Sequence, residues 1–473
     1  MRSAFDRTGP RGAGAIALGG SCAHDGNVPG GRVAAIVCAG VAGVTLALCL
    51  ASPLRAVSGD TLPGSLGGLV YRCGGGFDLA RISWMRGAIR HGKLPYWAQL
   101  DGDGHVISPY GPVPNLVGAL AMLDVATGDA LDDIAIRRRG RGAAAMLLAG
   151  CAALLAAAVG PAAQPRPSVL AALLAAGSFA GGATLGQGLW QQVVSLPCLL
   201  AGFALVVRRD DVPRLAPLAP ACLLASVLIR PTIGPLALGI GIAWIVTARR
   251  PTMRWILATG VALAVALPFV MWNLAHLGSV LPVGQWRSNA AFTSDIFVWS
   301  ARHVGEGLAG LLVSPGRGLL WFAPVAVFGI YRGLRSRDRA IRIIAGAAIA
   351  QILFIALFYI WWGGLCFGPR FLCEVTWIGC GLAVLPSFRP ALGHVAVIAI
   401  AVTLVVGQLG LWRWSGAQWE IRYRLEDDHA PLWQVVDSPL VALVTRSYSD
   451  AVIDSPPGEY RCEATGVQFT PRR

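Results

Sequence analysis

The sequence has 473 residues, of which 55% are hydrophobic and only 14% are charged, and its mean hydropathy is +0.60. Soluble domains carry about 25% charged residues, so this composition excludes an ordinary soluble protein. The formal net charge of +14 does not indicate a nucleic-acid partner, because the arginines stand in short clusters between apolar runs, with no basic helix or aromatic platform beside them. Apolar runs near the ~20 residues needed to cross a bilayer recur throughout. The sequence therefore predicts an all-α polytopic membrane protein.

Residues 1–31 are rich in glycine, alanine and arginine and are expected to form a disordered cytoplasmic tail. The apolar run 33–54 is longer than the ~7–15 residues of a signal-peptide core, which favours an uncleaved anchor. Because arginines precede this run, it is expected to pass from the cytoplasm to the outside.

A long polar, glycine-rich loop, residues 55–112, follows on the outside. Most connections have about 2–8 residues, so a loop of this length suggests a functional role. The apolar segment 113–126 is expected to return to the cytoplasm, because the basic run 137–141 (RRRGR) comes soon after it.

Three apolar stretches, 143–159, 169–185 and 189–207, lie between that basic run and Arg208. If both basic clusters are cytoplasmic, the number of crossings between them must be even. The middle stretch is therefore expected to be short, re-entrant or packed inside protein, where irregular backbone is tolerated.

Later apolar segments alternate with basic loops and lead to a second outer loop at 273–318. The expected total is about 11 crossings (10–13), with a transmembrane domain over residues 32–411. The tail, 412–473, has seven arginines against nine acidic residues and is expected to be a small extracytoplasmic cap. These later segments are 215–229, 233–248, 255–272, 319–331, 343–360, 371–385 and 395–411.

Eleven cysteines show no CxxC pair and no metal-like spacing. Most lie inside apolar runs and are expected to be core residues, as free cysteine usually is. Cys366, Cys373 and Cys380 repeat every seven residues, which predicts one packed helix face.

Two aspartates of the first outer loop are candidate catalytic residues. Asp60, in SGDT, follows the outer end of the first span, where a carboxylate could deprotonate or orient an acceptor hydroxyl or bind a cation. It would also suit a turn. Asp78, in FDLAR, is the second candidate, with a helix N-cap as its structural alternative. Asp101 and Asp103 are typical of a turn and lack the longer ligand series of a calcium loop.

Four further polar residues are candidates for substrate binding. Tyr110 could bind a sugar or anchor the membrane interface, and His105 could act as an acid or ligand or be an ordinary loop histidine. Gln191 and Gln192 begin an apolar span, where polar groups face the protein interior and bind a ligand or another helix.

Three arginines are placed near the outer face: Arg230, Arg317 and Arg370. An arginine at the bilayer centre costs at least about 2.5–3.5 kcal/mol, so such side chains need partners. A polyprenyl phosphate would be one, and snorkelling to lipid headgroups is the alternative. The glycines around Arg370 would allow close backbone approach.

Together these motifs resemble a family. GDT with LP, SPYGP, GLWQQ, IRPT, WNLAHLGSVLPVGQ, LLVSPGRGLLWFAP and WWGGLCFGPRF occur in an order that resembles the bacterial GT-C-type membrane glycosyltransferases. That group is similar to the dolichyl-phosphate-mannose protein mannosyltransferases and the lipid A aminoarabinose transferases. The resemblance covers about residues 33–411.

The resemblance implies a multi-pass enzyme of the bacterial inner membrane that transfers a sugar from a polyprenyl-phosphate donor to a glycan, lipid or protein acceptor of the cell envelope. Asp60 matches best the acidic residue that such enzymes carry in this loop. Many relatives have paired acids there, whereas Asp60 stands alone, and Gln191 and Gln192 stand where a histidine is expected. A divalent cation, Mg or Mn, remains open as a cofactor.

We expect inverting transfer, with Asp60 acting on the acceptor hydroxyl and with Arg370, helped by Arg230 or Arg317, neutralising the leaving phosphate. The alternative is a transporter or flippase of a lipid-linked glycan, or a non-catalytic scaffold. Transporters often show internal repeats, and no convincing repeat is present.

Overall fold

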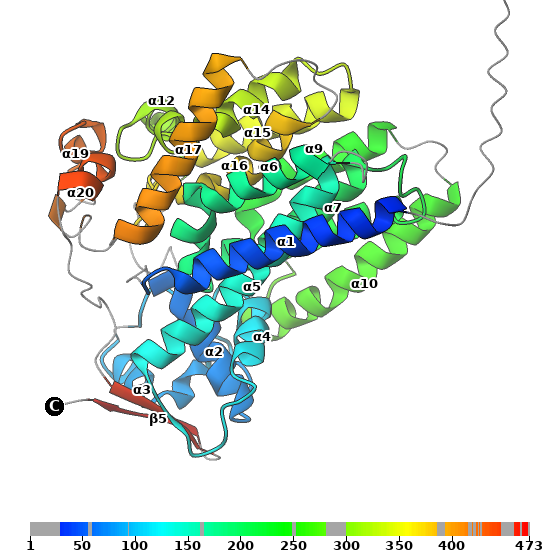
Figure 1. Ribbon diagram of the computed structural model, residues 1–473. Helices are drawn as coiled ribbons and strands as arrows, with labels where there is room; N and C mark the ends of the chain where they lie inside the picture. The colour runs from blue at the N-terminus through cyan, green and yellow to red at the C-terminus, as the bar shows by residue number, and fades with distance from the viewer. Residues whose placement is uncertain are drawn as a thin grey trace, which may run out of the picture.

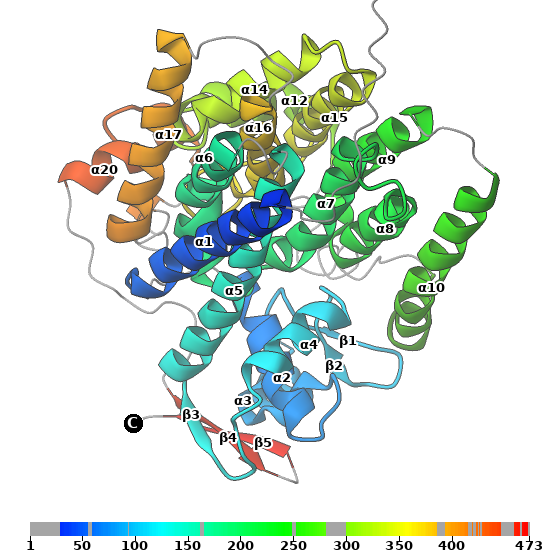
Figure 2. The ribbon, with the colours of Figure 1, turned by 45° about the vertical axis from the view of Figure 1, so that its right-hand side comes forward.

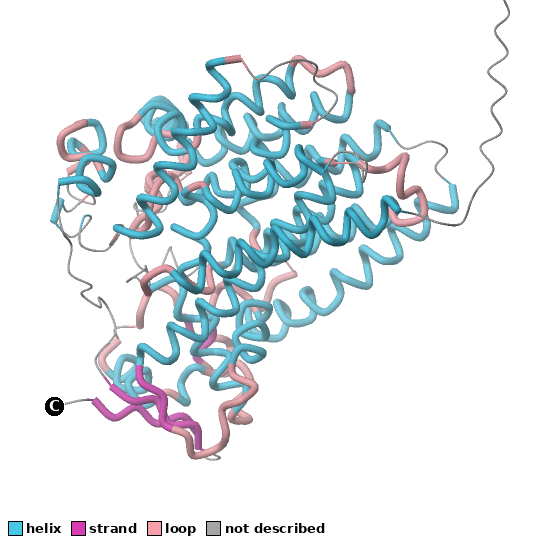
Figure 3. The backbone as a smooth tube through the Cα atoms, in the orientation of Figure 1, coloured by secondary structure: helices cyan, strands magenta, loops and turns pink. Residues whose placement is uncertain are grey.

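The computed structural model shows a mostly helical molecule (Figures 1 and 3). The expected N-terminal tail lies almost wholly outside the described residues, as does much of the expected outer loop 273–318. The described residues are 29–54, 59–92, 94–160, 165–247, 252–280, 299–385, 393–414, 419, 422–423, 425, 428–445, 458–463 and 466–471.

Five helices in the described part of the chain are long and apolar enough to cross a membrane. Their length and apolar composition support a membrane protein built from α-helices, while the expected total of about 11 crossings stays a prediction. The five are α1 (Pro29–Ala51), α5 (Asp133–Val159), α10 (Thr252–Leu277), α15 (Arg339–Ala356) and α17 (His394–Arg413).

Helices α1 and α5 lie side by side and run in opposite directions (Figure 1). Near the end of α1, the Arg141 guanidinium donates to the carbonyls of Ser52 (2.7 Å) and Leu50 (3.1 Å). These carbonyls lack partners within the helix, and a cation there also opposes the negative end of the helix dipole. We call this side of the bundle the loop end, and the opposite side, where α1 begins and α5 finishes, the far end.

This contact corrects two predictions. The basic run 137–141 lies at the loop end, on the same side as residues 59–112 and not across the bundle from them. The predicted crossing at 113–126 is instead α4 (Pro112–Ala121), whose 10 residues span about 15 Å, half the hydrocarbon thickness. It packs on α2 (Leu62–Arg72), where Gly68 and Gly118 let the two backbones approach closely.

The next helices build the middle of the bundle. The middle one of the three apolar stretches is short, as expected: α6 (Pro165–Gly177) gives way to a π-helical turn, Phe179–Ala183. Then follow α7 (Gln191–Val207), α8 (Ala219–Ile229) and α9 (Gly234–Thr247). Arg208 closes the far end, since its Nη1 donates to the carbonyls of Ala157 and Gly160 at the end of α5.

The second half contains α12 (Val304–Val313), α13 (Leu319–Phe322), α14 (Pro324–Leu334) and α16 (Cys373–Val384). A loop over residues 357–369 and the short turn Arg370–Leu372 separate α15 from α16. Cys366 lies in that loop and not on a helix, so only Cys373 and Cys380 share the predicted face of α16.

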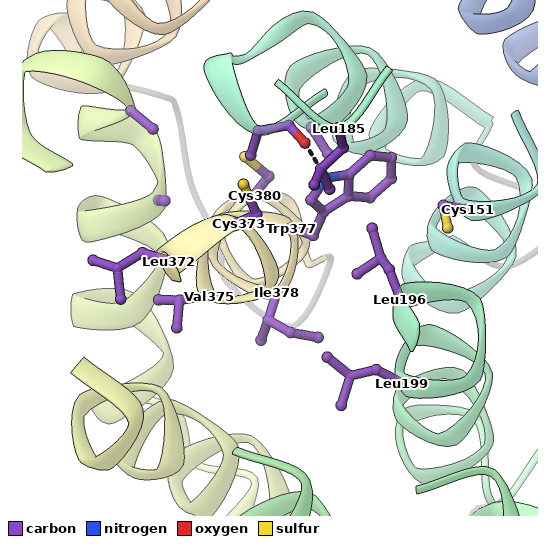
Figure 4. Close-up of a cluster of buried hydrophobic side chains, with 14 of the residues drawn as sticks. Cys151, Leu185, Leu196, Leu199, Leu372, Cys373, Val375, Trp377, Ile378 and Cys380 are labelled. Atoms are coloured by element: carbon purple, nitrogen blue, oxygen red, sulfur yellow. Dashed lines mark hydrogen bonds between the residues drawn. The ribbon is translucent and has the colours of Figure 1, made fainter. Parts of the chain in front are cut away.

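The main core surrounds α16. Figure 4 shows Trp377 and Ile378 of α16 directed toward Leu185, Leu196 and other buried side chains of neighbouring elements. The Trp377 indole donates to the carbonyl of Ala180 in the π-helical turn (3.1 Å). Carbonyls of such irregular turns need outside partners, so this bond fixes the turn on the core.

A second, smaller core holds the loop end together. It joins α2, the turn Leu79–Arg81, α3 (Ser83–Arg90) and the paired strands β1 (Gln99–Leu100) and β2 (Val106–Ile107). The C-terminal hairpin, β4 (Gly458–Glu463) and β5 (Gly466–Pro471), joins it by pairing with β3 (Ala130–Asp132) in the order β3-β4-β5. Figure 2 shows this sheet beneath α2 and α3.

A disulfide fastens the hairpin to the first loop. Cys73 caps the end of α2 and is bonded to Cys462 of β4, 389 residues later, with a Cα–Cα distance of 5.7 Å. The prediction that the cysteines are core residues holds for buried Cys49 and Cys151 but missed this pair. Disulfides persist in oxidising compartments, which favours an extracytoplasmic loop end.

Candidate functional site

Asp60 lies in a single 3-10 turn, Gly59–Thr61, immediately before α2. A Cβ on Gly59 would lie 3.1 Å from the Trp97 indole nitrogen and 3.2 Å from the Tyr96 hydroxyl. Glycine therefore lets this 3-10 turn pass close to the two rings. The rings themselves pack against the second core. The Asp60 carboxylate, one residue after Gly59, is held where the loop meets the helical bundle.

Three side chains converge on the Asp60 carboxylate, two from the first loop and one from the distant turn Arg370–Leu372. The Tyr110 hydroxyl donates to Oδ1 (2.6 Å), and Nη1 of Arg370 donates to Oδ2 (2.5 Å). Tyr96 adds a further hydrogen bond from the side chain. Asp60 and Arg370 are mostly buried, with 18% and 8% of their side chains exposed.

Arg370 is held between aromatic rings. Its guanidinium lies 4.6 Å from the ring centre of Trp190, in GLWQQ, and 5.1 Å from that of Phe371. The preceding loop turns at Gly363 and Gly368, with φ of +88° and +72°, a region that favours glycine. The buried Nε of Arg370 makes no hydrogen bond to any described residue. An unsatisfied buried donor is costly, so this edge of the guanidinium suits an added acceptor.

Burial and charge act in opposite directions on this group. Burial, the largest influence, raises the pKa of Asp60, but the charge of Arg370 and the bonds from Tyr110, Arg370 and Tyr96 outweigh it and leave the pKa below its usual value. Burial, reinforced by the Asp60 charge, raises the pKa of Tyr110 well above the ordinary value. The site thus holds an ionised carboxylate, an ionised guanidinium and a neutral Tyr110 phenol at neutral pH.

The two predicted glutamines have different surroundings. Gln191 Nε2 donates to the carbonyl of Ile229 (2.7 Å) and lies 3.4 Å from that of Tyr110, so it links α7, the end of α8 and the site. Gln192 is buried one position further along α7. Asp60, Arg370 and Trp190 of GLWQQ thus lie together, while binding of a ligand there stays a prediction.

Asp78 and His105 lie elsewhere in the loop. Asp78 Oδ1 accepts from the backbone amides of Ala80 (2.9 Å) and Val106 (3.0 Å), which is the capping role named as its alternative. His105 Nδ1 is 3.3 Å from Asp101 Oδ2, and Nδ1 of His276, at the end of α10, is 3.0 Å from the same oxygen. Neither contact touches the Asp60 group.

Arg230 and Arg317 are buried and already bound within the protein. Arg230 pairs with Glu374 of α16. Arg317 donates to the carbonyls of Trp362 (2.9 Å) and Gly364 (3.3 Å) and lies over the Trp419 ring. Both stabilise segments beside Arg370, and their contact with a donor phosphate stays a prediction.

One group in the described residues has ligand atoms close enough for a metal ion: those of Asp101, Asp103 and His105 lie within 4.8 Å of one another. The Asp101 carboxylate already accepts from two backbone amides and faces two imidazoles. These hydrogen bonds explain why residues 101–105 form a closed turn.

Sequence reasoning missed several residues of the site. Tyr96 in KLPYW and Trp190 in GLWQQ contact the central pair, and Glu374 neutralises Arg230. The only feature of the sequence that could have identified them is that each is an aromatic or acidic residue close to a polar motif in an apolar chain.

Comparison of this chain with protein-family models, with curated proteins and with solved structures found no match.

Proposed function

We propose that this protein is a GT-C-type glycosyltransferase of the bacterial plasma membrane that uses a polyprenyl-phosphate sugar donor. The observation that carries the proposal is the Asp60–Arg370 pair, which three distant segments enclose at one end of a membrane-helix bundle. Buried ionisable groups cost desolvation and cluster at functional sites, although structural pairs such as Arg230–Glu374 also occur.

The proposed topology has 11 crossings. Eight are α1, α5, α6, α7, α9, α10, α15 and α17, and three are short helices lengthened by the element before them: α8 by the turn Ala216–Leu218, α14 by α13, and α16 by the turn Arg370–Leu372. With α5, rather than α4, as the second crossing, α6 and α7 then pass out and back. The run 137–141 is then outside and Arg208 is cytoplasmic. Three crossings, α5, α6 and α7, can therefore separate the two basic clusters, and an even number is no longer required. The loop end, with the Cys73–Cys462 disulfide, then faces the outside.

In the proposed reaction, the donor phosphate binds Arg370 through the unsatisfied Nε and competes with Asp60 for the guanidinium. An acceptor hydroxyl attacks the anomeric carbon opposite the phosphate. A new carbon–oxygen bond forms, the bond to the phosphate oxygen breaks, and its electron pair leaves with the polyprenyl phosphate. Asp60, released from Arg370, accepts the hydroxyl proton, and Arg370 neutralises the leaving group.

A divalent cation fits the Asp60 group poorly. Mg²⁺ prefers an octahedral set of oxygen ligands, whereas the group offers one carboxylate, shared by a guanidinium and two phenols. We therefore assign no step to a metal, and we expect transfer to continue in EDTA.

The proposal is tested with purified protein in vesicles, a radiolabelled polyprenyl-phosphate sugar and a cell-envelope extract. Label in a new product supports a transferase, whereas label that only crosses the vesicle supports a transporter. Asp60→Asn should lower the transfer rate by about 10²–10⁴, and Asp103→Asn, the same change at an exposed position of the same loop, should not. Full transfer by Asp60→Asn, together with loss in a correctly folded Asp78→Asn variant, would overturn the assignment.

A further inference from the structure

A surface near the C-terminus is apolar although it lies outside the bundle. Residues 430–445, here called the C-terminal shelf, include α19 (Ala430–Trp433) and α20 (Pro439–Thr445). Four large apolar side chains of the shelf are exposed: Trp433 (39%), Val435 (56%), Val436 (75%) and Val444 (64%).

The shelf carries one charged residue, and that residue is engaged with the protein. Asp437 Oδ1 accepts from the Tyr423 hydroxyl (2.6 Å), and its carbonyl accepts from the Trp419 indole (2.8 Å). The exposed face is therefore mainly apolar, with Gln434 and Thr445 as its exposed polar side chains, and it carries no outward charge between residues 430 and 445.

The C-terminal shelf is held against the helical bundle by hydrogen bonds and packing. The Leu432 carbonyl accepts from the Ser314 hydroxyl (2.5 Å) and from the Gly316 amide (3.0 Å), which ties α19 to the turn after α12. α20 packs beside the final part of α17, and both ribbon views place it there (Figures 1 and 2).

That part of α17 marks a membrane boundary. α17 is one of the five helices able to span a bilayer, and it ends at Trp412, which is 41% exposed, and Arg413. Tryptophan and arginine at the end of a spanning helix are typical of the headgroup level. The exposed apolar surface of α17, including Ile398 and Val405, leads to the same level as the shelf.

We propose that the C-terminal shelf lies in the lipid surface at the loop end, with Trp433, Val435 and Val436 in the boundary between headgroups and acyl chains. Apolar faces of this kind enter about 5–10 Å into that boundary. A phospholipid surface fits because it continues the surface that α17 already offers to lipid. The inference depends on α17 crossing the membrane and not on transferase activity.

Nitroxide labels provide the test. Val436→Cys and Val444→Cys are labelled in the full-length protein, reconstituted in bilayers of phosphatidylethanolamine and phosphatidylglycerol. Collision rates with oxygen, which concentrates in lipid, and with a water-soluble nickel chelate are then compared. Asp103→Cys, exposed in the first loop, is the matched control, and unmutated protein treated in the same way gives the background.

The expected result is an oxygen-to-nickel collision ratio several-fold higher at residues 436 and 444 than at residue 103. An equal ratio at all three positions would place the shelf in water and overturn the proposal. Low collision rates with both reagents at residues 436 and 444 would show a protein cover instead and would equally overturn it.

Discussion

Arg370 donates a 2.5 Å hydrogen bond to Asp60, although 310 residues separate them in the sequence. The two mostly buried side chains form an ion pair with each other. Neither can therefore act on a substrate until this ion pair is broken. A ligand that carries its own negative charge is the natural agent, because it can replace the carboxylate at the guanidinium.

Replacing Asp60 with asparagine should therefore have two opposite effects. The transfer rate should fall by about 10²–10⁴, the usual contribution of an acid or base group. Binding of a polyprenyl monophosphate should tighten by about 5- to 150-fold, the range of typical coupling between competing events. Equilibrium binding to the purified variant measures this, with Asp103→Asn as control, and weaker binding would contradict the competition.

Replacing Arg370 with glutamine should destabilise the protein by about 3–5 kcal/mol, because it leaves the Asp60 carboxylate buried without its cation. The double variant, Asp60→Asn with Arg370→Gln, should recover much of that loss. Unfolding of the three variants in detergent measures the coupling. If the double variant loses the sum of the single losses, the two residues are not energetically paired.

The pair also predicts a pH dependence. The folded pKa of Asp60 lies below its unfolded value of about 3.9, so its stabilising contribution is present above that value and is lost as the pH falls through the folded pKa. Between pH 5 and 8 the difference in stability between wild type and Asp60→Asn should be constant, and it should shrink below about pH 4. A change near pH 6–7 would argue against this assignment.

The Cys73–Cys462 disulfide should stabilise the loop end. Its replacement by two serines should cost about 2–4 kcal/mol, with Cys222→Ser, which lies on α8 outside any disulfide, as control. Thiol counting before and after reduction measures the bond directly. Two additional reactive thiols in unreduced protein from intact cells would show that the bond does not form.

The corrected position of the basic run can be tested in intact cells. Arg138 is exposed at the loop end, whereas Arg335 is exposed after α14. A membrane-impermeant thiol reagent should label Arg138→Cys from outside and should not label Arg335→Cys. The reverse pattern would restore a cytoplasmic basic run and invert the proposed topology.

The prediction of two crossings before the basic run failed for a physical reason. Residues 113–126 and 33–54 look alike in hydropathy, but α4 has only 10 residues and packs its small residues, including Gly118, closely against α2 within the loop. The arginines of 137–141 resemble a cytoplasmic marker, yet Arg137 pairs with Asp133, Arg139 with Asp124, and Arg141 caps α1. The positive-inside rule counts arginines and lysines in a loop and takes no account of the residues that they pair with.

The sequence by itself determined the class of the protein, because low charge and recurrent apolar runs permit few structures other than membrane helices. It also singled out Asp60, Tyr110, Gln191 and Arg370, since polar groups in an apolar chain are costly and few. Only the tertiary structure decided which of these meet. Tyr96 and Trp190 complete the group around Asp60 and Arg370, whereas Asp78 caps a turn of the first loop and Arg317 binds a carbonyl of the loop 357–369. Contacts between distant segments depend on packing that no local pattern records.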